Sequence, residues 1–397
     1  MLLAKTPEIN SKIRAKAGCL KGAGACAALR LPLLWITIVS IVWFASCSPR
    51  MLEDGGRTLN PIEVLERSPR VYEITFKAFA DSIETARASS YLSGDLGADA
   101  FPSLRVLSAL QDSARAAGLS ARETAELEFF KARRRFEAGA EQAAGYHLKR
   151  AMAADPSYRP PYVLLGGMLL ERRAIEQAFD LFSKMLSWDA TDSDALVGLA
   201  RCYMRMGRID DARKTLVDAV IFNRANLKAW GDLEAVAELQ GASIANHDAP
   251  ELGLARKVTG RRYKILVDDS LQDCPVEATA WIAYASERAV WRFEDKFKMR
   301  FGVTKYVPTY EEDVDCYMVL AAAWQTLTQQ GEAQDSVPCS PAYLDYLGRV
   351  AEDGYLVSHV LFDHVSIEAP AVAKHFSVEV IARLREYVNT YVIVPKS

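Results

Sequence analysis

A repeat with a period of 34 residues constrains this chain more than any other feature of its sequence. Three consecutive copies align, and they cover residues 125–158, 159–192 and 193–226. Steps 4, 7, 8, 11, 15, 20, 24 and 27 of the third copy are occupied by Leu196, Leu199, Ala200, Tyr203, Gly207, Ala212, Leu216 and Ala219. The second copy keeps seven of these eight positions and has Arg173 at step 15. Apolar residues at helical spacing on either side of a glycine predict two antiparallel helices in each copy.

The residue types at these steps indicate how the helices pack. Small residues at steps 8, 20 and 27 allow close approach of neighbouring helices, and large apolar residues at steps 4, 7, 11 and 24 fill the space between them. Glycine at step 15 permits the left-handed backbone that ends the first helix. Because one hairpin cannot bury its own apolar face, we expect the copies to stack into a curved solenoid. The predicted fold class is therefore all-α.

This pattern resembles the tetratricopeptide repeat (TPR) family, whose repeat has the same length and the same signature positions. The resemblance begins at Ala125 and includes a partial fourth copy that reaches Gly241. It implies a solenoid that binds a partner rather than catalysing a reaction, with the first helix of each hairpin facing a concave groove. Carried over position by position, the implied partner-binding groove consists of Phe129, Arg133, Phe136, Val163, Leu170, Glu171, Val197, Arg201, Met204 and Arg205.

The character of this groove leaves two interpretations open. An apolar strip with Arg133, Arg201 and Arg205 around it suits a peptide or helix that has apolar anchors and a few acidic groups. The lysine and asparagine clamp of the chaperone-binding members of the family is absent, because Val163 and Gly167 occupy such steps. Alternatively, the arginines are solvated and the apolar residues pack against capping helices.

The start of the chain resembles a bacterial lipoprotein signal. Six basic residues and one acidic residue in 1–30 precede Leu31–Ala45, a stretch of fifteen uncharged residues. This stretch is short for a membrane-spanning helix, which needs about 20 residues, but typical of a signal-peptide core. Cys47 follows Phe44-Ala45-Ser46, which resembles a lipobox with phenylalanine in place of the usual leucine. The resemblance implies that Cys47 carries lipid and that the protein is exported.

Two details refine this interpretation of the leader. The alternative is an uncleaved membrane anchor, in which Cys47 has no role, and both interpretations place the body of the protein outside the cytoplasm. Ser48 follows the cysteine directly, and in this feature the leader resembles those of lipoproteins sent to the outer membrane, where they face the periplasm.

The remaining sequence completes a plan of five segments. These are a lipoprotein signal peptide, a tether, an N-terminal helical cap, the TPR array and a C-terminal helical domain, at residues 1–46, 47–60, 61–120, 121–241 and 242–397. The cap is expected to begin at Pro61, with Asn60 as its N-cap, to continue as a helix over Arg70–Leu92, and to cover the first hairpin.

The C-terminal domain is expected to be mostly helical and to include a degenerate repeat-like hairpin. A basic run over Leu252–Leu271 is interpreted as a solvated helix face. Leu344, Leu347, Gly348 and Ala351 repeat the first half of the array signature. Tyr391–Val394 is expected to form a short strand or an extended tail.

The cysteines of the body suggest at most one disulfide. Cys202 is expected to be a small buried residue. A helix of about 14 residues would hold Cys316 about 20 Å from Cys339, too far for a bridge. Cys274 and Cys339 both begin helices at one end of the stack, so this pair is the possible disulfide in an oxidising compartment.

Charge and motifs narrow the class of function. The net charge of the whole chain is −3 and no basic stripe is present, which argues against a nucleic-acid partner. His359 and His364 are five residues apart and miss metal-ligand spacing, and we expect no metal, no cofactor and no catalytic residues. The favoured hypothesis is a membrane-anchored scaffold for a protein or peptide in a cell-envelope assembly. The alternatives are a periplasmic binding or transport-accessory protein with a small-molecule pocket in the C-terminal domain, and an enzyme with a nonstandard site in 250–397.

Overall fold

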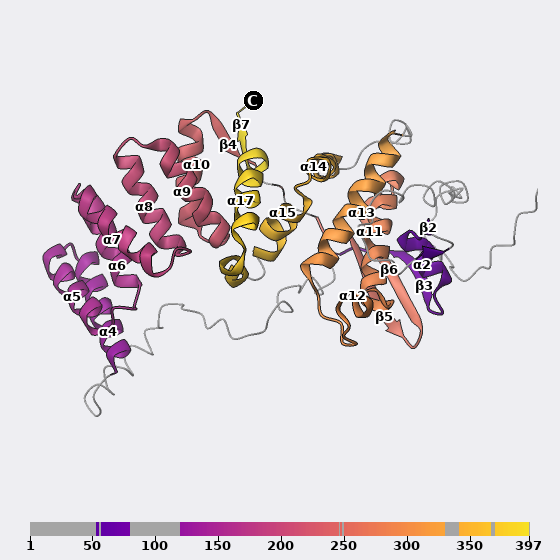
Figure 1. Ribbon diagram of the computed structural model, residues 1–397, viewed down its shortest axis with the longest axis horizontal. Helices are drawn as coiled ribbons and strands as arrows, with labels where there is room; N and C mark the ends of the chain where they lie inside the picture. The colour runs from indigo at the N-terminus through magenta and orange to yellow at the C-terminus, as the bar shows by residue number, and fades with distance from the viewer. Residues whose placement is uncertain are drawn as a thin grey trace, which may run out of the picture. The chain divides into compact units, whose positions relative to one another are not determined.

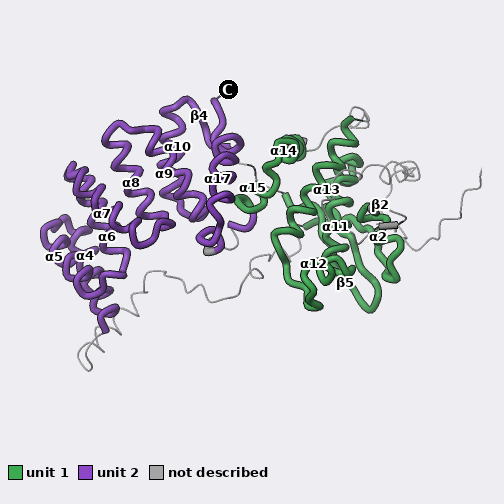
Figure 2. The backbone as a smooth tube through the Cα atoms, viewed as in Figure 1, with its two compact units in different colours: residues 1–91, 247–363 green, residues 92–246, 364–397 purple. Residues whose placement is uncertain are grey.

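The computed structural model describes residues 53–54, 57–79, 120–245, 247, 250–329, 341–366 and 370–396. The chain divides into two compact units, which Figure 2 shows in different colours. Unit 1 contains residues 1–91 and 247–363, and unit 2 contains residues 92–246 and 364–397. The predicted signal peptide, Cys47, the first part of the tether and Cys339 lie outside the described residues.

Unit 2 is built around the predicted array, which is a TPR-type helical solenoid (Figure 1). Three complete helical hairpins and the first helix of a fourth follow one another. Their helices are α4 (Ala121–Glu137), α5 (Glu141–Ala154), α6 (Pro160–Glu171), α7 (Ile175–Trp188), α8 (Ser193–Arg205), α9 (Ile209–Phe222) and α10 (Leu227–Leu239). Helix and turn alternate at the spacing that the repeat predicts.

The turn inside each hairpin repeats the same backbone conformation. Gly139, Arg173, Gly207 and Gly241 stand one repeat apart, and their φ angles are 73°, 59°, 77° and 71°. In the second hairpin the Ala174 amide donates to the Leu169 carbonyl at 2.9 Å, and in the third the Arg208 amide donates in the same way to Tyr203 at 2.9 Å. Arg173 therefore adopts the left-handed turn in spite of its side chain.

The packing between neighbouring hairpins depends on one large residue and two glycines. Phe182 on α7 lies between Gly166 on α6 and Gly198 on α8. A Cβ added at either glycine would stand 2.2 Å from the Phe182 ring. Only glycine therefore allows α6 and α8 to close on this ring, which is 2% exposed.

A buried carboxylate lies in the first hairpin. Glu128 on α4 is 3% exposed and accepts hydrogen bonds at 2.8 Å from both Lys131 Nζ and His147 Nδ1. The Arg150 guanidinium lies 3.5 Å from the same carboxylate. Burial raises the pKa of Glu128, but the hydrogen bonds from His147 and Lys131 outweigh burial and lower it below the usual value.

The end of the chain closes the far end of the array. After η4 (Pro370–His375), helix α17 (Val378–Tyr387) and the π-helical turn η5 (Val388–Val392) lead to strand β7 (Ile393–Pro395), which pairs antiparallel with β4 (Ala242–Ile244). The Arg385 guanidinium holds the Asp218 carboxylate on α9 at 2.6 and 2.9 Å. Of the strand or extended tail predicted over Tyr391–Val394, a strand forms at Ile393–Pro395, whereas Tyr391 and Val392 belong to η5. The prediction of one C-terminal domain over 242–397 is corrected, because residues 364–397 belong to the array's unit.

Unit 1 combines a small sheet with helices. The sheet has the order β3-β6-β5, with β3 parallel and β5 antiparallel to β6; the strands are β3 (Val71–Phe76), β5 (Gly253–Thr259) and β6 (Arg262–Val267). The helices are α2 (Pro61–Arg67), α11 (Pro275–Phe293), α12 (Lys296–Phe301), α13 (Tyr310–Gln329), α14 (Pro341–Glu352) and α15 (Leu356–Val360). Shorter elements are β1 (Glu53–Asp54), β2 (Arg57–Thr58), η2 (Asp269–Leu271) and the π-helical turn η3 (Leu361–Val365). Helix α2 begins at Pro61 under an Asn60 cap, as predicted.

Two segments predicted to be helical are strands. Within the predicted helix 70–92, residues 71–76 form β3, where Tyr72 is buried and stacks on the ring of Tyr263 with centroids 5.3 Å apart. The basic run of 252–271 is the β5–β6 hairpin, whose turn uses Gly260 at φ 54°. Aromatic and β-branched residues pack well in strands, and here a sheet partner overrides helical spacing. The predicted N-terminal cap over 61–120 is corrected accordingly, because residues 61–79 belong to unit 1.

Helices α11 and α13 enclose charged side chains. Arg288 on α11 is 1% exposed and pairs with Glu312 at 3.0 Å and with Asp313 at 2.8 Å, both on α13. Lys296 pairs with Glu287 and with Asp315. Burial lowers the pKa of Lys296, but these two carboxylates outweigh burial and raise it above its usual value. The helix pair is held by ionic contacts as well as by apolar packing.

Candidate functional site

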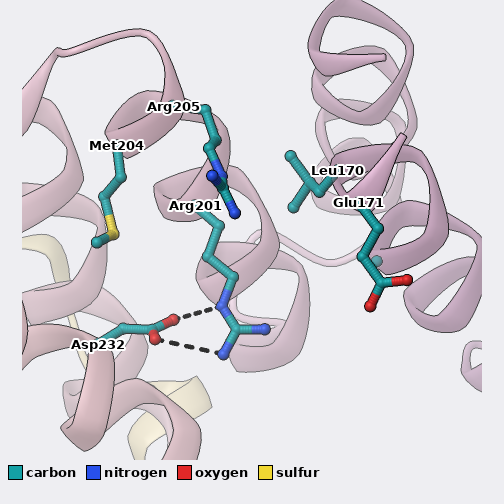
Figure 3. A pocket seen from close by; sticks show the side chains of 7 residues that line it. Leu170, Glu171, Arg201, Met204, Arg205 and Asp232 are labelled. Atoms are coloured by element: carbon teal, nitrogen blue, oxygen red, sulfur yellow. Dashed lines mark hydrogen bonds and ion pairs between the residues drawn. The ribbon is translucent and has the colours of Figure 1, made fainter. Parts of the chain in front are cut away.

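A cavity of about 500 Å³ opens along the first helices of three consecutive hairpins. Its lining comes from α6, α8 and α10 and consists of Gly167, Leu170, Glu171, Arg201, Met204, Arg205 and Asp232. Figure 3 shows Leu170 and Glu171 on one helix and Arg201 and Arg205 on the next, with Asp232 beyond them. We call this set of residues the groove.

The 34-residue repeat explains why these residues meet. Leu170 and Glu171 occupy steps 12 and 13 of the second copy, and Met204 and Arg205 occupy the same steps of the third. Gly167 and Arg201 likewise share step 9. Equivalent steps of stacked hairpins face the same side, so one sequence pattern repeated twice produces one continuous lining.

Arg201 is held inside the groove by a carboxylate. Its Nε donates to Asp232 Oδ2 at 2.6 Å, and its Nη2 donates to Asp232 Oδ1 at 3.3 Å. This two-point contact fixes the guanidinium and cancels most of its charge toward a ligand. Asp232 was not among the predicted groove residues, because it stands at step 6 of the fourth copy, a step that the family pattern does not assign to the groove. Its position 31 residues after Arg201, on the next first helix, was the available signal.

Arg205 and Glu171 are the charged groups that remain open to a ligand. Both side chains are exposed, and neither forms an ion pair within the described ranges. A Cβ added at Gly167 would meet nothing within 4 Å, so the groove wall is open at that point. The groove therefore offers one cation, one anion and the half-buried apolar side chain of Met204, while Leu170 is buried in its wall.

Five other residues of the predicted groove lie outside this cavity. Phe129 and Val197 are 7% and 3% exposed, and the Phe129 ring packs edge-on against Tyr158. These two residues do not line the cavity, and their place in the predicted groove stays a prediction. Val163 and Phe136 are half-buried, and Arg133 lies 3.4 Å from Glu137 on its own helix.

The cysteines and histidines give no second site in the described part of the chain. Cys202 is buried and free, as expected, and burial raises the pKa of its thiol to about 11. Cys274 is disulfide-bonded, but the predicted partner Cys339 falls outside the described residues, so the pairing stays a prediction. His359 is fully buried, with Nδ1 3.0 Å from Asp363. Among the described residues, no group of three or more His, Cys, Asp or Glu could hold a metal ion.

Comparison with known proteins supports the repeat assignment. Residues 169–237 match the family described as tetratricopeptide repeat. A solved structure of a tetratricopeptide repeat protein from Parabacteroides merdae ATCC 43184 is similar at 16% sequence identity, covers 68% of this chain and 100% of that chain, and has a TM-score of 0.26. No curated protein matches the chain. The matched segment contains every residue of the groove except Gly167.

Proposed function

We propose that this protein is an adaptor that captures a segment of a partner protein in the groove. TPR repeats generally mediate protein–protein interaction. The observation that carries the proposal is the cavity, because its lining comes from three successive first helices and from the residue steps that a TPR ligand would contact. The proposed role is binding and requires no catalytic step.

The side chains of the groove define the ligand that fits it. An apolar side chain can pack on Met204, while an acidic group can pair with Arg205 and a basic group with Glu171. The Arg201–Asp232 pair adds rigid hydrogen-bonding edges with little net charge. We therefore infer a peptide segment that carries both charge signs and an apolar anchor.

We further propose that the adaptor works in the cell envelope, held by lipid on Cys47 and facing the periplasm from the outer membrane. The support comes from the sequence of the leader, in which fifteen uncharged residues precede the lipobox-like Phe44-Ala45-Ser46-Cys47. Within the described ranges, no helix is both long enough and apolar enough to cross a bilayer.

Capture by the groove can be tested with a charge reversal at the open cation. Arg205→Glu is expected to lower partner recovery after in-cell crosslinking at least about tenfold, because an acidic group of the ligand would then meet a carboxylate. Arg134→Glu makes the same charge change on the exposed face of α4 and should leave recovery unchanged. Equal recovery with both variants would refute groove binding.

Anchoring can be tested independently of capture. Cys47→Ala should release the protein from the membrane fraction and abolish incorporation of labelled fatty acid. Labelling that persists in this variant would refute the lipobox interpretation. If Cys47→Ala releases the protein from the membrane and partner recovery is unchanged, the groove proposal still holds.

A further inference from the structure

One end of unit 1 exposes cations and apolar side chains together. It consists of the outer part of the β5–β6 hairpin, residues 256–262, and the segment 298–307, which begins within α12. Every residue of 256–262 and of 298–305 is exposed. We call these two segments the basic end.

Large apolar side chains gather in the second segment. Met299 is 40% exposed, Phe301 39%, and Val303 and Val307 49% each. Their neighbours in sequence are Lys298, Arg300 and Lys305, and residues 296–309 contain no acidic residue. Apolar side chains of this size usually lie in a core, so their concentration here calls for a partner.

The second segment is held in place by aromatic packing beneath it. The ring of Phe297 is buried, with its centroid 5.1 Å from that of Phe301 and 5.3 Å from that of Tyr306. Gly302 ends α12 in the left-handed conformation at φ 70°. The exposed side chains are therefore presented by a supported turn.

The hairpin turn adds cations at the same end of α11. Tyr263 on β6 packs on Phe293, the last residue of α11, with ring centroids 4.8 Å apart, and α12 begins three residues later. Figure 1 shows the β5–β6 turn and α12 at the lower end of unit 1. This outer part of the hairpin exposes Val258 and four cations, Arg256, Lys257, Arg261 and Arg262, and residues 253–267 contain no acidic residue.

Most of this positive charge is not neutralised within the protein. Within the described part of the chain, no carboxylate forms an ion pair with Lys257, Arg261, Arg262, Lys298, Arg300 or Lys305. The nearby Glu294 is engaged by Arg70 at 2.6 Å. The basic end is therefore complementary to an anionic surface.

We propose that the basic end docks on an anionic phospholipid membrane. Cations attract the anionic headgroups, and the apolar side chains among them bury in the interfacial layer. A nucleic acid would match the cations, but it would leave the aliphatic side chains of Val258, Met299 and Val303 in water. The proposal does not depend on the groove.

Pro61 follows Cys47 by 14 residues, so a lipid on Cys47 would hold unit 1 within about 50 Å of the bilayer.

The test is hydrogen exchange of the full chain with vesicles, read at the amides of 256–262 and 298–307. This local measurement separates docking of the basic end from insertion of the apolar leader. Vesicles of phosphatidylcholine with phosphatidylglycerol should protect both segments, and high salt should weaken the protection. Pure phosphatidylcholine should give little protection. Absent protection on anionic vesicles, or equal protection on both kinds, would overturn the proposal.

Charge variants test the cations against a matched control. Lys298→Glu/Arg300→Glu/Lys305→Glu should lower the vesicle-induced protection factor at least about tenfold. Arg134→Glu/Arg135→Glu/Lys149→Glu changes the net charge equally at exposed cations of unit 2 and should change nothing. Equal loss in both variants would reduce the effect to overall charge and overturn the proposal.

Apolar variants distinguish a membrane from other anionic partners. Met299→Ser/Val303→Ser keeps all the charges and should still lower the protection several-fold, whereas Leu227→Ser/Val378→Ser should not. No effect of the first variant, or protection by a single-stranded DNA homopolymer without protection by vesicles, would overturn the membrane proposal.

Discussion

In unit 2, hairpins pack through apolar side chains that fit between small ones, and Phe182 between Gly166 and Gly198 is the tightest example. In unit 1, the α11–α13 pair instead encloses Arg288 between two carboxylates. The first arrangement uses residues within one repeat of each other. The second arrangement pairs buried charges of opposite sign, and the helix packing is destabilised if either the cation or the carboxylates are removed. The comparison shows that one chain stabilises its helix pairs in two ways, by apolar packing in the array and by buried ion pairs between α11 and α13.

The two units also differ in how far apart their contacting residues lie in the sequence. Array helices pack on the next helix along the chain, whereas β3 pairs in parallel with β6 across the whole array. The Phe79 amide, just after β3, donates at 2.9 Å to Asp268, which is 189 residues later. The array therefore needs only its neighbours, while unit 1 needs both of its separated parts.

The largest effect is expected from removing the central charge of unit 1. Arg288→Met should lower the free energy of unfolding by about 3–5 kcal/mol, because Glu312 and Asp313 would lose the buried guanidinium between them, although Glu312 keeps Arg292 at 2.9 Å. Hydrogen exchange of the α11 and α13 amides in the full chain measures this. Arg288→Met/Glu312→Gln/Asp313→Asn should recover part of the loss. A loss below about 1 kcal/mol in the single variant would show that the α11–α13 helix pair is stabilised by apolar packing, as in the array.

A methyl group at the glycine contact of the array should have the next largest effect. Gly166→Ala places a Cβ 2.2 Å from the Phe182 ring. It should lower the free energy of unfolding by about 2–3 kcal/mol, because the ring also packs against Gly198 on its other side and cannot move away. The adjacent Gly167→Ala meets no atom within 4 Å and should stabilise α6 by about 0.5–1 kcal/mol. Thermal unfolding of both variants measures the contrast. Equal stabilities would mean that the Phe182 contact does not limit helix approach.

Glu128 allows the chemistry of unit 1 to be tested inside the array. Glu128→Gln should cost about 1–2 kcal/mol at neutral pH, because the carboxylate's hydrogen bonds to Lys131 and His147 are charge-assisted. The pKa of Glu128 is lowered in the folded state, so this stabilisation is present above the usual value of 4.5 and is lost as the pH falls through the folded value. The two proteins should thus converge in stability in acid. Glu137→Gln, at an exposed position of the same helix, is the control; a difference that persists in acid would contradict the ionic explanation.

The smallest effect is expected at the irregular turn of the array. Arg173→Gly should raise stability by about 1 kcal/mol, because glycine adopts φ 59° without the Cβ clash. Arg173→Ala removes the same charge but keeps the Cβ, so it should give no gain. Thermal unfolding distinguishes the two. Equal gains would assign the effect to charge and not to backbone conformation.

The sequence predicted the array well because its information is local. The steps of the repeat located each turn, including the one at Arg173, and placed Leu170, Glu171, Arg201, Met204 and Arg205 on a common face. Phe129 and Val197 occupy steps that face the groove by resemblance to the family, yet here they are buried. The step of a residue in the repeat predicts which face of the helix it lies on, but it does not predict how deeply the side chain is buried.

The sheet of unit 1 could not be predicted from local spacing. The segment 71–76 has apolar residues compatible with either a helix or a strand, and its strand partner lies beyond the array. The cations of 256–264 suggested a solvated helix face, although Gly260 between Val258-Thr259 and the alternating Tyr263, Ile265 and Val267 was the available hairpin signal. Pairing between distant segments leaves no periodic trace in either of them.

The parallel pairing of β3 with β6 has a consequence for the newly made chain. β3 leaves the ribosome first, but the strand it must join is encoded after the whole array, as the 189-residue span from Phe79 to Asp268 shows. At about 5–20 residues per second, β3 waits roughly 10–40 s without a partner. During this interval the hairpins of the array can stack on one another as they emerge, while Val71–Phe76 lacks its strand partner and stays accessible to chaperones and to aggregation. The order of synthesis therefore makes unit 1, and not the repeat array, the part of this protein most prone to aggregation during translation.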